Sequence, residues 1–575
     1  MDVDEGLVCL GKWSRWQLMM YLIINMSLCF PACWHMLAIV FVGQEPTIHC
    51  KLPEGVIRDN TTVPWDKENE KLDSCKVYVN YTIDTNDTIK CPHGMEYGDE
   101  VFSIVNQWDL ACDKAYLVSM SQTVLVAGVF IGAVVNTMLA DKIGRKLVFL
   151  TSIMGISLFG FIASFVNSYI AFTALRFFIG YFQQGIILVG FVLACELFPA
   201  GQRTFAGLLM QCFWAFGMFA LALFAYLTRH WRHLMLAISL PGVLCIPLYW
   251  VLPESIPWLV AVGRIHEAKV ILNKAAKFNK VRLPKRFRLT EEEMNETLPT
   301  FKEKLRTMAA AFRKNNKESY DVNEKDEPVQ EETESSVTYT VLDIIKSCKL
   351  LFFSLVMCYL WCVSALVYYG LSLSTGSLAG DIYLNFFLSG LVEIPAYIIG
   401  AFMLQYLGRR ISIASFYILA GIPLFITVFL DSKSTATVVL AMIGKLGITA
   451  AFGSVFLYAP ELFPTTLRNI GIGIASIGGR VGNIAAPFAP LAAKVLPWLP
   501  NVIFGVMALL AGGLTFLLPE TLHRPLPSSI SEVEKWRLTL TKEEKAKAKQ
   551  VAEAAKAREM EVLNQRGNDS DEEKA

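Results

Sequence analysis

Four charged residues lie inside long apolar stretches of this sequence, in the segments "LRFFIG", "LVEIPAY", "IGKLGI" and "GGRVGN". They are Arg176, Glu393, Lys445 and Arg480. A charge at the centre of a bilayer costs about 2.5–3.5 kcal/mol on insertion scales, so each one needs a ligand, an ion or a buried partner. Their side chains are therefore the first candidates for a binding site.

Arg480 is flanked by three glycines, Gly478, Gly479 and Gly482. Residues without a side chain leave room for a ligand or for a neighbouring backbone to come close. Two interpretations stay open here: the guanidinium meets a ligand, or it forms a structural ion pair with Glu393 or another buried acid.

Glu393 stands two residues before Pro395, which removes a backbone donor and frees carbonyl groups nearby. It is expected to lie near a substrate ammonium, or to take up a proton or a sodium ion as a coupling site. Arg176 and Lys445 occupy related places, in the fourth and the tenth apolar stretch. For these two, a contact with substrate and a role in helix packing are both open.

Aromatic residues gather in the segment "LWCVSALVYYG", which contains Trp361, Tyr368 and Tyr369. Trp361 and Tyr368 are seven residues apart and share one face of a helix. Aromatic faces attract quaternary ammonium groups through cation–π contacts, although such a stripe also suits plain packing.

The composition shows what must position these residues. Of the 575 residues, 54% are hydrophobic and only 18% are charged, whereas soluble domains carry about 25% charged residues. The net charge is +1 and no basic tract is interleaved with aromatic residues, so nothing indicates nucleic-acid binding.

Stretches of about 20 apolar residues, long enough to cross a bilayer, recur along the chain. They are expected at 17–43, 117–140, 147–166, 169–195, 204–227, 234–252, 348–373, 379–404, 411–430, 436–459, 469–494 and 499–518. The sequence therefore predicts an all-α membrane protein with twelve transmembrane helices in two blocks of six.

The distribution of charges predicts the orientation. Residues 263–325 hold 16 Lys and Arg against 9 Asp and Glu, whereas residues 44–115 hold 7 against 14. Because positive loops stay in the cytosol, both termini are expected there, in a multi-pass protein of the plasma membrane. The segment "TRHWRH" (228–233) is a short exception on the outer side.

Residues 44–115 also read as an extracellular loop. Three glycosylation sequons stand in it, at Asn60, Asn80 and Asn86. It also holds four cysteines, Cys50, Cys75, Cys91 and Cys112, which predict two disulfides. Three pairings are possible, and the sequence does not choose among them.

Three short sequence motifs occur twice in the chain, and the distance between the two copies is nearly the same for all three. "GRK" at 144 and "GRR" at 408 are 264 residues apart, "ELFP" at 196 and 461 is 265 apart, and the prolines of "LPES" and "LPET" at 253 and 519 are 266 apart. This agreement indicates two parallel, pseudo-symmetric halves with six helices each, an arrangement of transporters that bind substrate between the halves. The expected domains are a first half (1–252), a cytoplasmic linker (253–347), a second half (348–518) and a cytoplasmic tail (519–575).

The repeated loops carry charges of both signs that suit a conformational gate: Asp141, Arg145, Glu196 and Arg203 in the first half, and Arg409, Glu461 and Arg468 in the second. Glu196 is expected to pair with Arg145 or Arg203. Glu461 is expected to pair with Arg409 or Arg468. Contacts of this kind hold two helices together in one conformation and release them in the other. The alternative is that the charges only fix the topology.

Several strings together resemble the major facilitator superfamily, and within it the organic cation, anion and zwitterion transporter family. "DKIGRK" resembles the superfamily loop between helices 2 and 3, with Thr137 in place of a usual glycine, and Gln405 replaces the usual acid in the second copy. "NQWDLACDKA" resembles the segment that leads into helix 2, and "LPESIPWL" the segment after helix 6. The resemblance extends to about residue 530, and the second half is most similar to the carnitine and zwitterion branch.

The resemblance implies a central cavity that opens alternately to each side. Anion and carnitine members have arginine at the position of Arg480, so Arg480 is expected to meet a substrate carboxylate. Tyr397 stands where anion-transporting relatives carry lysine, and Gln184 stands where cation-transporting relatives carry lysine. Ser364 stands where some cation transporters have an acid.

The sequence thus predicts a transporter of small organic cations or zwitterions, such as carnitine- or betaine-like amines, that works by alternating access. The expected substrate-binding residues are Arg480, Glu393, Trp361, Tyr368, Tyr369, Gln184 and Lys445. The alternatives are an organic anion transporter that uses Arg480 and a non-transporting receptor on the same fold. No HExxH, GxSxG or metal-ligand spacing is found, so neither an enzyme, a metal site nor a cofactor is expected. Sodium or a proton is a possible coupling ion, and a monomer is expected.

Overall fold

The computed structural model describes residues 3–289 and 341–539, except for residues 12, 67–70, 82–86, 285–286, 432–433, 465–466, 523, 525–526 and 528. Most of the predicted linker and tail, residues 290–340 and 540–575, therefore lies outside the described residues.

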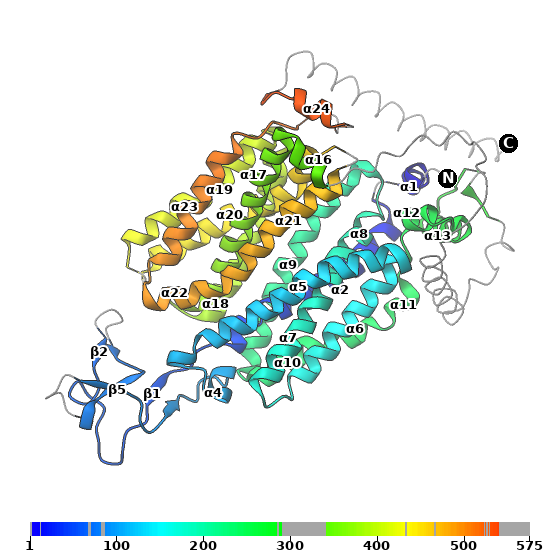
Figure 1. The fold of residues 1–575 in the computed structure, drawn as a ribbon. Coiled ribbons are helices and arrows are strands. Elements are labelled where there is room, and N and C mark those ends of the chain that lie inside the picture. Colours follow the sequence, from blue (N-terminus) through cyan, green and yellow to red (C-terminus); the bar gives the residue numbers. More distant parts are fainter. Residues whose placement is uncertain are drawn as a thin grey trace, which may run out of the picture.

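Helices make up most of the described chain (Figure 1). The first half, together with the start of the predicted linker that packs on it, contains α1 (Val3–Leu10), α2 (Arg15–Leu37), α3 (Ile39–Val42), α4 (Ile104–Trp108), α5 (Tyr116–Ile143), α6 (Arg145–Ala163), α7 (Tyr169–Gln184), α8 (Gly190–Cys195), α9 (Ala200–Thr228), α10 (Trp231–Ser239), α11 (Leu248–Val251), α12 (Ile256–Ala261) and α13 (Ile265–Asn279). The second half, together with the end of the linker and the start of the tail, contains α16 (Val341–Lys346), α17 (Cys348–Leu373), α18 (Ile382–Tyr406), α19 (Arg409–Ile426), α20 (Thr435–Leu462), α21 (Arg468–Ala485), α22 (Ala489–Val495), α23 (Leu499–Thr515) and α24 (Ile530–Lys535). Helices dominate because a lipid-exposed backbone must satisfy its polar groups within its own segment.

Within the described residues, ten helical segments are long and apolar enough to span a membrane: Arg15–Val42, Cys112–Ile143, Arg145–Ala163, Tyr169–Cys195, Gly201–Thr228, Trp231–Val251, Cys348–Gly376, Ile382–Tyr406, Arg409–Phe429 and Thr435–Leu462. Two predicted spans remain. The eleventh corresponds to α21, the 3₁₀ turn Ala486–Phe488 and α22, which follow one another without a break. The twelfth corresponds to the shorter apolar helix α23. The predicted all-α fold with twelve transmembrane helices is therefore confirmed in its order and approximate boundaries.

The helices form two hydrophobic cores, one for each half. The first core contains buried residues between Leu7 and Phe287, and the second contains buried residues between Ile344 and Trp536. Phe386 of α18 is the one described residue of the second half whose buried side chain belongs to the first core. The two bundles lie side by side (Figure 1), with α18 packed against α9 and α21 packed against α5.

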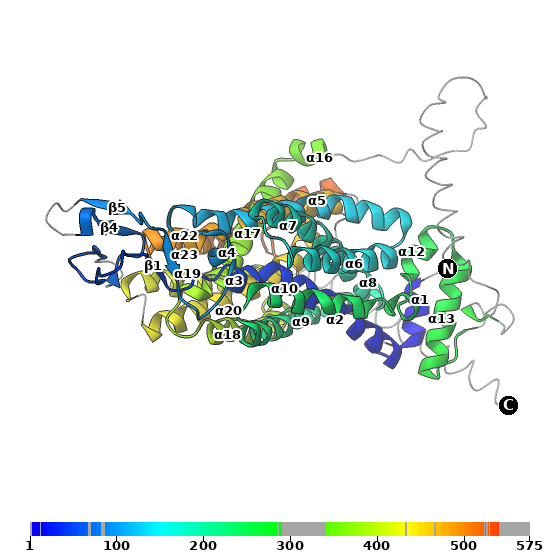
Figure 2. The same cartoon turned by 90° about the horizontal axis from the view of Figure 1, so that it is seen from below.

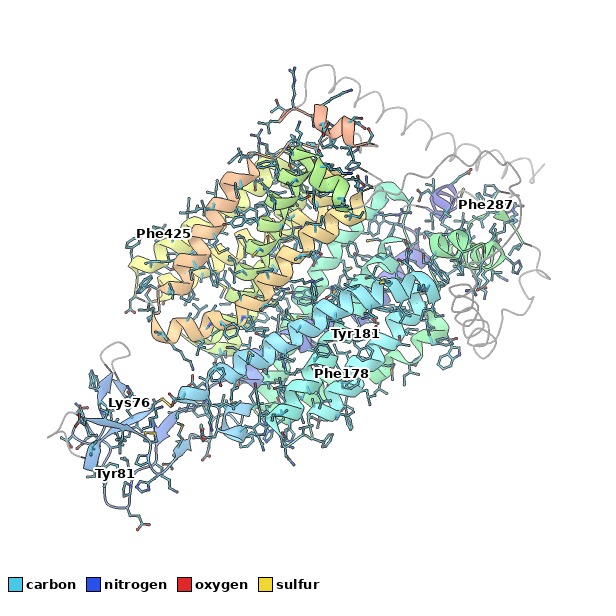
Figure 3. All side chains as sticks on the ribbon, viewed as in Figure 1. Lys76, Tyr81, Phe178, Tyr181, Phe287 and Phe425 are labelled. Atoms are coloured by element: carbon cyan, nitrogen blue, oxygen red, sulfur yellow. A yellow bond between two sulfur atoms is a disulfide. The ribbon has the colours of Figure 1, made fainter. Side chains whose placement is uncertain are left out.

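Glycines allow the closest helix contacts. A Cβ atom on Gly128 or Gly132 of α5 would come within 2.0 Å of the Phe177 oxygen or 2.2 Å of the Tyr181 oxygen of α7. Two glycines four residues apart let two helix backbones touch, as in other membrane bundles. On the other side of α7, the ring of Phe178 stacks on Phe159 of α6 at 5.0 Å; Tyr181 and Phe178 are labelled in Figure 3.

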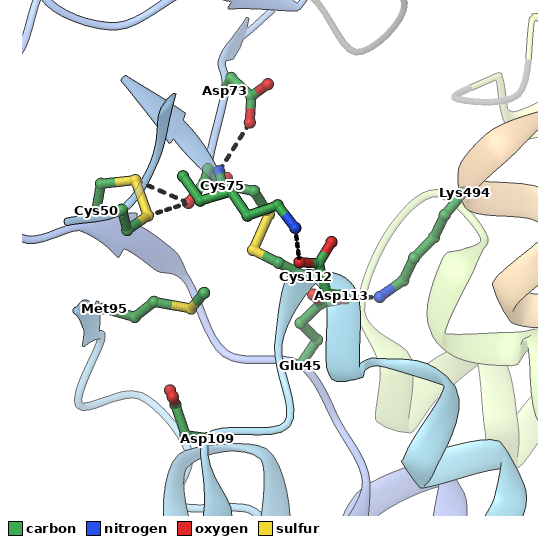
Figure 4. The surroundings of a disulfide bond; sticks show 12 residues. Glu45, Cys50, Asp73, Cys75, Met95, Asp109, Cys112, Asp113 and Lys494 are labelled. Atoms are coloured by element: carbon green, nitrogen blue, oxygen red, sulfur yellow. Dashed lines mark hydrogen bonds and ion pairs between the residues drawn. A yellow bond between two sulfur atoms is a disulfide. The ribbon is translucent and has the colours of Figure 1, made fainter. Parts of the chain in front are cut away.

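The described residues of the segment after the first span form three small antiparallel sheets at one end of the molecule. Their strands are β1 (Ile48–Cys50) with β6 (Met95–Tyr97), β2 (Trp65–Asp66) with β3 (Lys71–Leu72), and β4 (Lys76–Tyr78) with β5 (Thr88–Lys90). Two disulfides join them, Cys50–Cys91 and Cys75–Cys112 (Figure 4). The prediction of two disulfides is confirmed, and the structure selects one of the three possible pairings.

We call this end of the bundle the loop face. The loop is attached to the turn between α9 and α10, where the Phe102 amide donates to the Arg229 carbonyl at 3.1 Å and the Trp231 amide donates to the Phe102 carbonyl at 2.9 Å. Of the three predicted sequons, Asn60 is exposed, Asn80 lies in a 3₁₀ turn and Asn86 lies outside the described residues. Their glycosylation remains a prediction.

The opposite end, which we call the terminal face, carries the helices appended to each bundle (Figures 1 and 2). Leu7 of α1 is fully buried in the first core, and the Trp16 amide donates to Asn279 of α13 at 2.9 Å. On the second half, α24 and the residue after it bury Val533 and Trp536 in the second core. The short α1 and α24 segments thus belong to the packed bundles.

Candidate functional site

Lys445 and Glu393 form an ion pair in the interior of the second half. The Lys445 Nζ atom lies 3.2 Å from Glu393 Oε1, and the two side chains are 2% and 0% exposed. Helix α20 supplies the lysine and α18 supplies the glutamate, and these helices pack against each other. Because a buried charge without a partner is costly, this pair accounts for both residues in the bilayer interior.

Three further groups surround the lysine nitrogen. Nζ lies 3.4 Å from the centre of the Tyr368 ring, donates to the Tyr368 carbonyl at 3.3 Å and also donates to Ser372 Oγ. The Tyr368 hydroxyl donates to Glu393 Oε1 at 2.7 Å. We call Tyr368, Ser372 and Glu393 the ammonium site, because a carboxylate, a hydroxyl and an aromatic face together suit an ammonium group.

Aromatic side chains extend the ammonium site along α17 and α20. The Trp361 ring lies 4.2 Å from Phe456 and 6.3 Å from Phe452, and Phe452 lies 5.7 Å from Tyr368. Trp361 and Tyr368 therefore share one face, as the spacing of seven predicts. Sequence reasoning missed Phe452 and Phe456, although they follow Lys445 by seven and eleven residues and so lie on its side of α20.

Arg480 has a different environment. Its side chain is half-buried on α21, and among the described residues it forms neither an ion pair nor a hydrogen bond. The residue before it, Gly479, packs against the Trp361 side chain, where an added Cβ atom would lie 3.2 Å from the ring. The ion pair of Glu393 is with Lys445, so the expected alternative of a Glu393–Arg480 pair does not apply.

The glycines beside Arg480 serve the neighbouring backbone. A Cβ atom on Gly478 would come within 1.9 Å of the Cys358 oxygen of α17, and one on Gly482 within 2.3 Å of the Cys362 oxygen. Of the two uses that the sequence left open, the structure shows close helix packing at these two positions. This packing holds α21, and with it Arg480, against the helix that carries Trp361 and Tyr368.

Tyr369 places this cluster at the boundary of the two halves. The side chain is half-buried and packs against both hydrophobic cores. Its ring lies 5.1 Å from that of Tyr368 in an edge-on arrangement. Tyr369 thus connects the boundary between the halves to Tyr368 of the ammonium site.

The first-half candidates lie elsewhere. Arg176 is 1% exposed, and its guanidinium donates to Gln122 Oε1 of α5. Gln184 is buried at the end of α7, just before the π-helical turn Gly185–Val189. Among the described residues, neither side chain has a hydrogen bond or ion pair with the ammonium site.

A cluster of charges stands at the terminal face of the first half. Arg145 forms an ion pair with Glu196 and donates to Ser255 Oγ at 3.1 Å. Glu254 Oε1 accepts the backbone N–H groups of Arg145 and Lys146, both at 3.0 Å, at the start of α6. A carboxylate there satisfies free helix amides and meets the positive end of the helix dipole.

The second half repeats this cluster. Arg409 pairs with both oxygens of Glu461, at 3.0 Å from Nε and 2.9 Å from Nη2. Thr521 Oγ1 donates to Glu461 at 2.5 Å, and Glu520 accepts the amide of Arg409 at 2.8 Å and that of Arg410 at 3.0 Å. The equivalents of Ser255 and Glu254 are thus Thr521 and Glu520, which supports the internal repeat.

Two glycines make room for these carboxylates. Gly144 has φ +105° and Gly408 has φ +92°, and a Cβ atom on either would come within 2.5 Å of the carboxylate of Glu254 or Glu520. Only glycine adopts such a backbone readily. Sequence reasoning missed both glutamates, although each stands in a repeated string, "LPES" or "LPET".

The remaining gate candidates have other partners. Arg203 pairs with Asp4 at 2.8 Å rather than with Glu196, and Arg468 Nε donates to the Pro460 carbonyl at 2.9 Å. The backbone carbonyl of Asp141 accepts from Trp258 Nε1 at 2.9 Å. These terminal-face contacts all join elements of the same half.

At the loop face, contacts cross between the halves. The Phe41 ring stacks on Tyr383 at 5.5 Å and meets Phe386 at 5.0 Å. Glu45 forms an ion pair with Lys494, as Figure 4 shows. These ring and ion-pair contacts join the two halves at the loop face.

Twelve membrane-spanning helices in two repeated halves, with a charged and aromatic cluster at the boundary, define a membrane transporter of the major facilitator fold. The chain belongs to the family described as "Sugar (and other) transporter", whose family model matches residues 68–531. The family consists of transporters, so the expectation that the chain is not an enzyme is confirmed.

Relatives of known name extend over almost the whole chain. The "Organic cation transporter protein" of Drosophila melanogaster is 35% identical over 551 residues, which cover 93% of this chain and 95% of the relative. "Organic cation/carnitine transporter 2" of Rattus norvegicus is 32% identical over 563 residues, which cover 92% and 94%. The predicted membership of the organic cation and carnitine transporter group is therefore confirmed.

Among solved structures, the proton:xylose symporter XylE bound to 6-bromo-6-deoxy-D-glucose matches with a TM-score of 0.55 and 14% identity. The match covers 90% of this chain and 98% of XylE. At this identity the likeness shows the fold alone.

Proposed function

We propose that this protein carries small organic zwitterions and cations, carnitine- or betaine-like amines, across the membrane by alternating access between its two halves. The observation that carries the proposal is Arg480, a half-buried arginine without an ionic partner among the described residues, beside an ammonium site lined by aromatic rings. A guanidinium fork pairs both oxygens of a carboxylate, and aromatic faces hold a quaternary ammonium. The names of the organic cation/carnitine relatives support the same class of substrate.

The balance of charge favours a solute that bears a carboxylate. Lys445 neutralises Glu393, which leaves the positive charge of Arg480 without compensation among the described residues of the site. A zwitterion brings the missing negative charge. The same observation favours an organic anion as the second candidate function.

The aromatic contacts at the loop face support a state in which the site is closed on that side. The charge counts of the sequence favour an orientation with the loop face outside the cell and both termini in the cytosol. In this proposal the protein is a glycosylated monomer of the plasma membrane. Movement of one half against the other exposes Arg480 to each side in turn.

Uptake of radiolabelled carnitine, tetraethylammonium and p-aminohippurate, each with and without sodium, tests the proposal in transfected cells. We expect carnitine uptake to exceed that of the other two and to fall about tenfold or more in Arg480→Gln. Arg537→Gln, at an exposed arginine of the tail, is the matched control, and surface biotinylation corrects for expression. Uptake of p-aminohippurate alone would instead support the anion transporter, and uptake of none of the three would contradict the proposal.

A further inference from the structure

We infer that Lys445 acts as a tethered competitor: in the empty protein its ammonium occupies the place that the ammonium of a substrate takes, and it must leave for that substrate to bind. The inference deepens the proposed function and rests on it for the identity of the substrate. It makes Lys445 a residue that determines specificity rather than one that binds the solute.

The surroundings of Lys445 Nζ are those of a bound ammonium. The nitrogen has a carboxylate at 3.2 Å, a carbonyl at 3.3 Å and the centre of an aromatic ring at 3.4 Å, and it donates to the hydroxyl of Ser372. An ammonium has three N–H donors, and these three oxygen acceptors match them. The ring adds a cation–π contact, which needs no N–H group and therefore serves a quaternary ammonium equally well.

One carboxylate oxygen of Glu393 in the ammonium site has no hydrogen-bond donor among the described residues. Glu393 Oε1 receives both the Tyr368 hydroxyl and Lys445, whereas Oε2 is buried and has no hydrogen-bond partner among the described residues. A buried carboxylate oxygen without a donor is costly. A pair that served packing alone is expected to satisfy both oxygens, as the Arg409–Glu461 pair does with three donors.

The competition explains how the site distinguishes a zwitterion from a simple cation. A simple cation makes only the contacts that Lys445 makes in the empty protein. Its binding therefore replaces one ammonium in the ammonium site by another. A zwitterion also forms an ion pair between its carboxylate and Arg480. Among the described residues Arg480 has no ionic partner that this ion pair would have to replace. Removal of the tethered ammonium should therefore improve the binding of simple cations more than that of carnitine.

The transport test compares the KM of tetraethylammonium and carnitine in wild type, Lys445→Met and Lys445→Arg. We expect Lys445→Met to lower the KM of tetraethylammonium about tenfold, which corresponds to about 1.4 kcal/mol, with a smaller change for carnitine. Lys445→Arg keeps a cation in place and should not lower it. An unchanged or higher KM for tetraethylammonium in Lys445→Met at normal surface level would overturn the inference.

A second test does not depend on transport. Purified Lys445→Ala should have a vacant ammonium site that methylammonium fits, so methylammonium chloride should raise its melting temperature by about 2–4 °C relative to sodium chloride. Wild type and Lys349→Ala, which removes a lysine from the terminal face, should show no such shift. Recovery of folded Lys445→Ala only in the presence of methylammonium would also support the inference.

The two tests separate this inference from the proposed function. A methylammonium shift without uptake of carnitine, tetraethylammonium or p-aminohippurate would support the ammonium site and contradict the proposed substrates. Uptake of these solutes, without a methylammonium-induced rise in the melting temperature of folded Lys445→Ala, would support the proposed substrates and contradict the inference about Lys445. Failure of Lys445→Ala to fold with or without methylammonium would show that the pair is structural and would overturn the inference.

Discussion

The ring of Phe41 stacks on the ring of Tyr383 across the boundary between the two halves, with 5.5 Å between the centroids and 5° between the planes. Phe41 ends the first span and Tyr383 begins the eighth, so the contact joins segments from different bundles. The Glu45–Lys494 ion pair lies on the same face. Alternating access requires that these contacts separate in every transport cycle.

A covalent link between the halves at this face should stop transport. We expect a membrane-permeant bis-methanethiosulfonate, which joins two thiols through reducible disulfides, to abolish uptake by Glu45→Cys/Lys494→Cys and a reducing agent to restore it. The matched control is Arg264→Cys/Glu267→Cys, an ion pair at the start of α13 between neighbouring residues of the same half, whose cross-linking should leave uptake unchanged. Full uptake by cross-linked Glu45→Cys/Lys494→Cys would show that the loop face does not open.

Acid should loosen the attachment of the loop. Burial, to which the Phe102 ring stacked on His230 at 4.8 Å contributes, is the main cause that lowers the pKa of His230 below its usual 6.5. His233 and Arg232 of α10 lower the same pKa further, but they stay beside His230 when the loop detaches, so only the burial is lost. The detached His230 therefore binds a proton more readily than the attached one, so attachment is strongest above about pH 6.5 and weakens as the pH falls below it. Hydrogen exchange of the Phe102 and Trp231 amides measures this effect, because both amides donate across the attachment.

His230→Asn is the control for the effect of pH. Nδ1 of His230 accepts the Arg232 amide at 3.2 Å, and asparagine caps a helix in the same way without titrating in this range. The protection factors of the two amides, the intrinsic exchange rate at each pH divided by the observed rate, should not change in His230→Asn between pH 7.5 and about pH 5.5. An equal loss of protection in the wild type and the variant would assign the effect to another group.

The disulfides are open to direct mapping. Mass spectrometry of non-reduced peptides should find Cys50 linked to Cys91 and Cys75 linked to Cys112. Double replacement of either pair by serine should destabilise the loop by about 2–5 kcal/mol, measured as more rapid proteolysis within residues 44–115. A Cys50–Cys75 link would contradict the loop described here.

Periodicity and repetition in the sequence predict most of the fold. Each apolar stretch is long enough to span the bilayer, and the offset between "GRK" and "GRR" identifies the halves because their loops perform the same packing twice. The pairing of Lys445 with Glu393 is not predictable in this way, since it depends on how α18 and α20 meet in space. The Arg203–Asp4 pair was missed because the N-terminal segment folds back onto the terminal face, which no local pattern signals.

The repeated carboxylates should contribute equally to stability. Glu254→Gln and Glu520→Gln each weaken charged hydrogen bonds to the first amides of α6 or α19, and we expect each to cost about 1–3 kcal/mol. A lower melting temperature of the purified protein by a similar amount in both variants measures this cost. Glu54→Gln, at an exposed residue of the loop, is the control. A loss in only one half would show that the two clusters are not equivalent.

The central claim is that Arg480 binds the carboxylate of the substrate. The most direct measurement is the ratio of uptake efficiency, maximal rate divided by KM, for carnitine and for its methyl ester, which keeps the ammonium and lacks the negative charge. Arg480→Gln should lower this ratio about tenfold or more, because the carboxylate alone loses its partner. An unchanged ratio, or intact carnitine uptake in Arg480→Gln together with its loss in Glu393→Gln, would contradict the claim.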